Sequence, residues 1–157
     1  MREIKFRAKV SEEMKELYQK INDTSNILIT CPDTDFVYGD LHLKCNHPHI
    51  HVDSRSKYWI DIDTIGQFTG IYDKNGKEMY EGDIVNWTFF EYVGKEIEYH
   101  LTGIIEWYQG GFIFKVVKKD YEDASFYSVS GLDTDTECDC EIIGNIYDNK
   151  EFLNNEI

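Results

Sequence analysis

The chain has 157 residues, of which 41% are hydrophobic and 15% aromatic, enough apolar side chain to build a packed core and to exclude wholesale disorder. Its formal net charge is −14, from 30 acidic and 16 basic side chains, which argues against direct nucleic-acid binding because that binding depends on clustered Lys and Arg. The N-terminus has no apolar leader and no 18 apolar residues run together, so we expect a cytoplasmic protein that does not associate with a membrane.

The N-terminal segment predicts a strand followed by a short helix. Apolar and basic residues alternate from Ile4 to Val10, which is typical of a half-buried strand with a basic outer face. The basic residues of this face are Lys5, Arg7 and Lys9. Ser11 is a suitable N-cap, and apolar residues then recur at helical spacing, which predicts an amphipathic helix over residues 12–21.

The rest of the chain predicts short strands. Before residue 62 they are expected at residues 27–30, 36–43 and 58–62. The segment from Gln67 to Val85 predicts a hairpin, because its Asp-x-Asn-Gly sequence at residues 73–76 tolerates the positive φ of a tight reversal.

Five strands separated by glycines follow this hairpin and predict a small closed or nearly closed antiparallel barrel over residues 84–147. Gly103 is expected at a bend or at a close approach of two backbones. The side chains predicted inside the barrel are Val85, Trp87, Leu101, Ile105, Phe112, Phe114 and Ile143.

Four segments of the chain also carry a family resemblance. They are residues 1–7, residues 36–41 with their Tyr-Gly pair, the long block of residues 64–85, and residues 142–147. These segments are spread over nearly the whole chain, and in them the sequence is similar to the YopX family of small phage and prophage proteins. The resemblance implies a mainly β protein whose C-terminal half is an SH3-like barrel, and it implies no activity.

The predicted fold class is therefore mainly β, with a small SH3-like barrel in the C-terminal half and an N-terminal β-rich segment that carries one short helix. We expect a β-rich region over residues 1–65, followed by the hairpin and barrel over residues 66–157. The chain departs from the family pattern at residues 11–35 and 45–51, and any special role of this member is expected there.

One of these departures is rich in metal-ligating side chains. Its candidates occupy alternate positions, with Cys31 and His42 upstream, and are Cys45, His47, His49 and His51. Such ligands suit zinc, and alternate positions on a strand point to one side. Their spacing differs from the usual zinc-binding patterns and Pro48 interrupts a strand, so we favour an exposed loop. We predict no cofactor, with zinc at these four residues as the alternative.

Acidic residues form the second candidate site. From residue 120 to residue 149 there are nine acidic side chains and no Lys or Arg. Alternate positions within this segment would form one carboxylate stripe on a strand, and they are Asp133, Asp135, Glu137, Asp139 and Glu141. The stripe is either a solvated face, which could lie against the basic face of residues 4–10, or a partner-binding surface.

The sequence favours a non-catalytic protein, because it contains no P-loop, nucleophile elbow, HExxH or dinucleotide fingerprint. We expect a phage or prophage accessory protein that acts through protein–protein contacts with its acidic surface, on a host or phage protein in the bacterial cytoplasm. One alternative is a metal-dependent, nuclease-like enzyme that combines the carboxylates of residues 133–141 with the histidines of residues 47–51. Another is an inhibitor that imitates DNA. The sequence does not decide whether the chain forms a homo-oligomer.

Overall fold

A computed structural model describes residues 3–24, 35–43, 48–54, 56–92, 94, 96–119, 126–132 and 139–155. The described part of the chain is mainly β with one α-helix, as the sequence predicts. The chain divides into two compact units, residues 1–67 (unit 1) and residues 68–157 (unit 2). Within the described ranges, no helix is long and apolar enough to cross a membrane.

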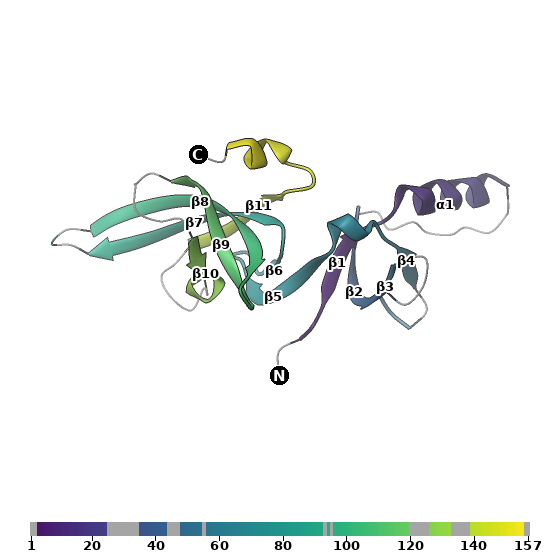
Figure 1. Ribbon diagram of the computed structural model, residues 1–157, viewed down its shortest axis with the longest axis horizontal. Helices are drawn as coiled ribbons and strands as arrows, with labels where there is room; N and C mark the ends of the chain where they lie inside the picture. The colour runs from purple at the N-terminus through teal and green to yellow at the C-terminus, as the bar shows by residue number, and fades with distance from the viewer. Residues whose placement is uncertain are drawn as a thin grey trace. The chain divides into compact units, whose positions relative to one another are not determined.

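Unit 1 combines one helix with short strands. In chain order these elements are β1 (Phe6–Lys9), α1 (Glu12–Thr24), β2 (Phe36–His42), β3 (His49–His51), β4 (Lys57–Trp59), the 3-10 turn η1 (Ile62–Thr64) and the start of β5 (Gly66–Tyr72). The strands pair antiparallel in the order β4-β3-β2-β1-β5 (Figure 1). β3 was predicted as a loop, and the strand predicted at residues 27–30 lies outside the described residues.

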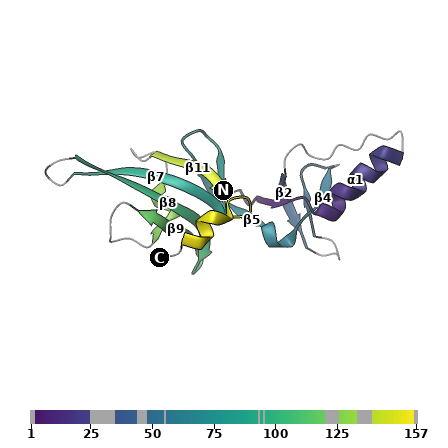
Figure 2. The ribbon, with the colours of Figure 1, turned by 90° about the horizontal axis from the view of Figure 1, so that it is seen from above.

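The helix α1 begins where the sequence predicts, because Ser11 caps it. The Met14 N–H donates to the Ser11 Oγ at 3.3 Å, which satisfies one of the donors that a helix start leaves unpaired. Met14 is 7% exposed, so the apolar face of α1 packs onto the core of unit 1, and Figure 2 shows the helix extending from the small strands. The buried residues of this core are Ala8, Val10, Met14, Val37, Ile50 and Ile60.

The predicted basic outer face of β1 is wrong at Arg7, which is only 4% exposed. β1 lies between β2 and β5, and side chains on an inner strand are flanked by those of both neighbours. The Arg7 guanidinium accordingly lies over the Phe36 ring, 4.9 Å from its centroid, in a cation–π contact.

Unit 2 is formed by the remaining strands and two 3-10 turns. In chain order they are the rest of β5, β6 (Glu78–Tyr80), β7 (Asp83–Tyr92), β8 (Glu96–Tyr108), β9 (Gly111–Lys119), β10 (Phe126–Ser128), η2 (Val129–Leu132), β11 (Asp139–Asn145) and η3 (Lys150–Asn155). β7 and β8 are the long paired strands of Figure 1. Five strands form an antiparallel sheet in the order β10-β9-β8-β7-β11.

This sheet is open, so the predicted closure into a barrel is wrong for the described part of the chain. β10 and β11 stand at its two ends, and no ladder between described residues joins them. β10 has only three residues, too few to extend the sheet far, and the outer side of β11 is occupied by the turn at residues 73–77, where the Lys74 N–H donates to the Cys140 carbonyl at 2.9 Å.

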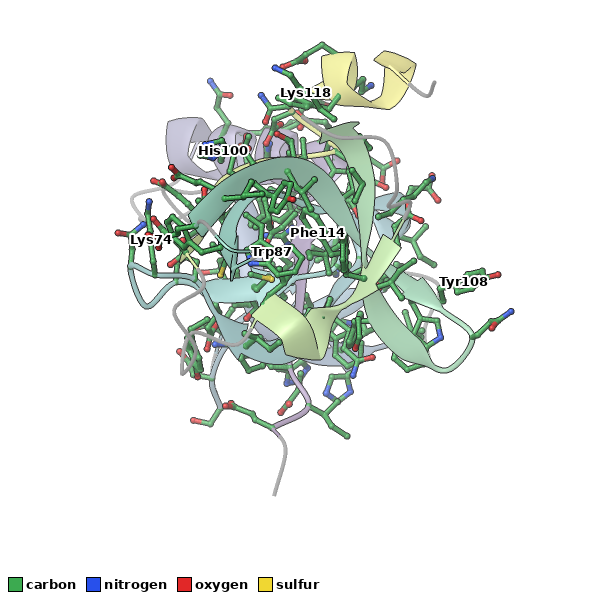
Figure 3. All side chains as sticks on the ribbon, turned by 90° about the vertical axis from the view of Figure 1, so that its left-hand side faces the viewer. Lys74, Trp87, His100, Tyr108, Phe114 and Lys118 are labelled. Atoms are coloured by element: carbon green, nitrogen blue, oxygen red, sulfur yellow. The ribbon has the colours of Figure 1, made fainter. Side chains whose placement is uncertain are left out.

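Six of the seven predicted interior side chains of unit 2 are confirmed as buried core residues: Val85, Trp87, Leu101, Ile105, Phe112 and Phe114. Figure 3 shows Trp87 and Phe114 enclosed by the curved sheet, with their rings 5.7 Å apart in an edge-to-face contact. Ile143 is 42% exposed instead. The β11–β7 register shifts between Ile142 and Gly144, so Ile143 sits in a bulge and Ile142 packs against the core.

The close backbone approach predicted at Gly103 is confirmed. A Cβ added there would stand 2.6 Å from both the Lys115 carbonyl oxygen and the Phe114 ring, which a side chain cannot occupy. The β8–β9 register shifts at the same place, between Thr102 and Gly103. Glycine therefore lets β9 and the Phe114 ring lie directly against β8.

Candidate functional site

The negative charge of the protein is concentrated in unit 2. This unit contains 19 acidic and 7 basic side chains, whereas unit 1 contains 11 and 9. Unit 2 therefore carries −12 of the net charge of −14. The sequence alone contains these counts, but they become informative only once the boundary between the units is known.

Within the described residues, two carboxylates of the predicted acidic stripe lie on one face of β11. Asp139 and Glu141 flank Cys140, which is fully buried, so strand alternation turns both acids outward. Lys74 contacts both, at 3.3 Å from an Asp139 oxygen and 2.7 Å from a Glu141 oxygen. Asp133, Asp135 and Glu137 lie outside the described residues.

The contact with Lys74 alters the electrostatics of this acidic face. Its hydrogen bond to Glu141, and after it the bond to Asp139, raise the pKa of Lys74 although partial desolvation opposes the shift. All three side chains remain substantially exposed, so the ion pairs stabilise the fold only weakly. One ammonium against two carboxylates leaves the described face of β11 negative.

A buried carboxylate places Lys74 beside β11. Asp73, 3% exposed, accepts hydrogen bonds from the backbone N–H groups of Asn75 at 2.8 Å, Lys77 at 2.9 Å and Ile142 at 3.2 Å. Burial on its own raises the pKa of Asp73, but these backbone hydrogen bonds outweigh it and lower the pKa below its usual value. Residues 73–77, which we call the Asp73 turn, are thereby fixed to β11.

The histidine-rich segment is partly described. Cys45 and His47 lie outside the described residues, whereas His49 and His51 lie on β3. His42, on β2, joins them, and the possible ligand nitrogens of the three lie within 4.8 Å of one another. Sequence reasoning noted His42 only as an upstream residue, because nothing in the sequence sets the pairing of β2 with β3.

The environment of His51 disfavours protonation of its ring. Desolvation, followed by the nearby His42, His49 and Lys57, lowers the pKa of His51, and Asp40 opposes this shift. A neutral imidazole retains a lone pair that can accept a hydrogen bond or bind a metal.

A shallow hollow of about 330 Å³ on unit 2 was not anticipated from the sequence. Its lining residues come from β7, β8 and β9 and are Asn86, Trp87, Thr88, His100, Leu101, Thr102 and Lys118; Figure 3 labels three of them. The Thr88 Oγ1 lies 3.1 Å from the His100 Nδ1, and Glu98 lies 3.7 Å from the Nε2. His100 and Glu98 are both more than half exposed, unlike the enclosed groups whose reactivity burial tunes.

Known proteins are similar to this chain over nearly its whole length. The model of the family described as YopX protein matches residues 5–154. Among solved structures, the crystal structure of protein EF1440 from Enterococcus faecalis is similar, with 22% sequence identity, a TM-score of 0.40, and coverage of 98% of this chain and 99% of that chain. No curated protein sequence matches this chain.

Proposed function

The chain belongs to the YopX family, a family of uncharacterised function, and we propose that it is a non-catalytic binding protein that contacts a positively charged partner through its acidic unit 2. The observation that carries this proposal is the uneven charge. Unit 2 holds −12 of the net −14, while unit 1 is close to neutral. A charge needed only for solubility has no reason to be confined to one unit.

The described face of β11 supports the acidic unit as the contacting part. Asp139 and Glu141 stand side by side on it, and Lys74 contacts both of them. A basic partner would gain favourable long-range attraction before contact and charge complementarity after it. Nucleic acid would be repelled, since its phosphates carry the same sign of charge.

The partner class follows from this charge and from the family. A basic host or phage protein in the bacterial cytoplasm fits an acidic accessory protein of a phage or prophage. The nuclease-like alternative draws its groups from both units, and no contact between described residues supports it.

The experiment is capture of partners from bacterial lysate, before and after phage infection, on immobilised protein washed with increasing salt. The test variant is Asp133→Asn, Asp135→Asn and Glu137→Gln combined. The matched control is Glu13→Gln, Glu16→Gln and Asp63→Asn, which removes the same charge from exposed positions of unit 1.

We expect a basic protein that the wild type and the unit 1 control retain equally, and that the unit 2 variant releases at lower salt. Salt screens the attraction between the acidic surface and a basic partner, with a screening length of about 8 Å at physiological ionic strength. A variant with fewer charges should therefore lose its partner at a lower salt concentration. Capture that is insensitive to salt and equal for all three proteins would contradict the proposal, as would equal losses from both variants.

A further inference from the structure

β2 pairs with β3 in unit 1 (Figure 1), and this pairing brings three imidazoles together. His42 lies directly opposite His49, and His51 lies two residues further along β3. Opposite residues of an antiparallel pair and alternate residues of one strand point to the same side. The three histidines therefore share a face.

Core packing fixes the register that brings them together. Ile50, between His49 and His51, is fully buried in the unit 1 core. A slip of one residue would expose Ile50 and turn both histidines inward, which the burial of Ile50 opposes. Gly39 permits this close pairing, since a Cβ at this position would clash with the His51 carbonyl oxygen.

The distances suit a shared ion. Ring centroids are 5.3 Å apart for His42 and His49, 4.2 Å for His42 and His51, and 4.9 Å for His49 and His51, and the nitrogens lie within 4.8 Å of one another. Zinc–nitrogen bonds of about 2.0–2.1 Å in a tetrahedral site place two ligand nitrogens roughly 3.3 Å apart. The rings are stacked or tilted by 8° to 32°, so they must turn about their side-chain torsions to aim three nitrogens at one ion, and the exposed His42 can turn most freely.

We propose that His42, His49 and His51 bind one divalent transition-metal ion, of which zinc is the representative, on the outer face of the β2–β3 pair. Imidazole nitrogens favour zinc, copper and nickel over magnesium and calcium, which prefer oxygen. Three protein ligands leave a fourth position open for water or for a donor from another molecule. All three ligands come from unit 1.

The charges around the site are balanced. Asp40 lies opposite His51 on β2 and attracts a cation, whereas Lys57 lies opposite His51 on β4 and repels it. With these two effects opposed, affinity rests on the three nitrogen ligands. Loss of any one of them should therefore weaken the site strongly.

The test uses tag-free protein stripped of metal with EDTA and then titrated with zinc by calorimetry. We expect one zinc per chain and a melting temperature that rises with zinc, since a ligand that binds only the folded state stabilises it. Loss of a residue that only supports a metal ligand weakens metal binding by about 10- to 100-fold. The single replacements His42→Asn, His49→Asn and His51→Asn remove a ligand itself, so each should weaken zinc binding by at least as much. His100→Asn is the matched control and should bind as the wild type does.

A second measurement locates the ion without any substitution. Zinc should shift the imidazole NMR signals of His42, His49 and His51 and leave those of His100 in place. Absence of stoichiometric binding would overturn the proposal. So would binding that survives all three replacements, or zinc-induced shifts that spare these three rings.

Discussion

The replacement Asp73→Asn tests whether one buried carboxylate holds the Asp73 turn against β11. In the wild type, Oδ1 accepts from the N–H groups of Asn75 and Lys77, and Oδ2 accepts from the Ile142 N–H. Asparagine keeps one acceptor oxygen and replaces the other by an NH₂ donor. At least one backbone N–H then loses its acceptor and faces a donor instead.

The expected cost follows from the kind of bond that is lost. A hydrogen bond to a charged group contributes about 1.5–3 kcal/mol, so Asp73→Asn should lower the free energy of unfolding by about 2–3 kcal/mol. For a domain of the size of unit 2, that lowers the melting temperature by roughly 4–8 °C per kcal/mol. Lys74→Gln is the matched control in the same turn, because it removes only exposed ion pairs, worth about 0–1 kcal/mol.

The effect should depend on pH with a defined sign. Because the pKa of Asp73 is lower in the folded than in the unfolded protein, its stabilisation is complete above the unfolded-state pKa and is lost as pH falls through the folded-state pKa. The stability difference between wild type and Asp73→Asn should therefore be largest near neutral pH and shrink in acid.

Urea denaturation followed by tryptophan fluorescence, repeated at several pH values, measures both effects. The reasoning is refuted if Asp73→Asn costs no more than Lys74→Gln at neutral pH. A difference between wild type and Asp73→Asn that stays constant into strong acid would refute the electrostatic part.

Three further predictions concern the core of unit 2, and equilibrium denaturation checks each of them. Trp87→Ala should cost about 3–5 kcal/mol, because it empties a site that is 6% exposed; a cost below about 1 kcal/mol would place Trp87 outside the core. Ile142→Ala should destabilise clearly more than Ile143→Ala, and the reverse order would contradict the bulge in β11. Gly103→Ala should cost about 1–3 kcal/mol by overpacking against the Phe114 ring, and an unchanged stability would show that β9 can move away.

The acidic face and the histidine cluster differ in what the sequence could reveal. The acidic residues recur at alternate positions of one short segment, so the stripe is visible as a pattern in the sequence, although its contact with Lys74 is not. His42 is separated from His49 by a segment whose length says nothing about strand register. The sequence therefore indicated ligands at residues 45–51 but did not identify the group of three.

By itself, the sequence determined the features that depend on neighbours along the chain. The alternation of apolar and polar residues predicts the inward side chains of β7, β8 and β9. Ser11 predicts the start of α1, and the motif at residues 73–76 predicts a turn. Each follows from local sterics, hydrogen bonding and side-chain periodicity, which a single segment expresses without its partners. The family was also recognisable from such local segments.

Only the tertiary structure decided the features that depend on partners distant in sequence. The bulge that turns Ile143 outward arises in the pairing of β11 with β7, and the burial of Arg7 arises because β1 has a neighbour on each side. The open sheet, the Asp73 turn docked on β11 and the three gathered histidines have the same origin. Strand register and edge coverage are set by long-range packing, and periodicity within one strand cannot specify them.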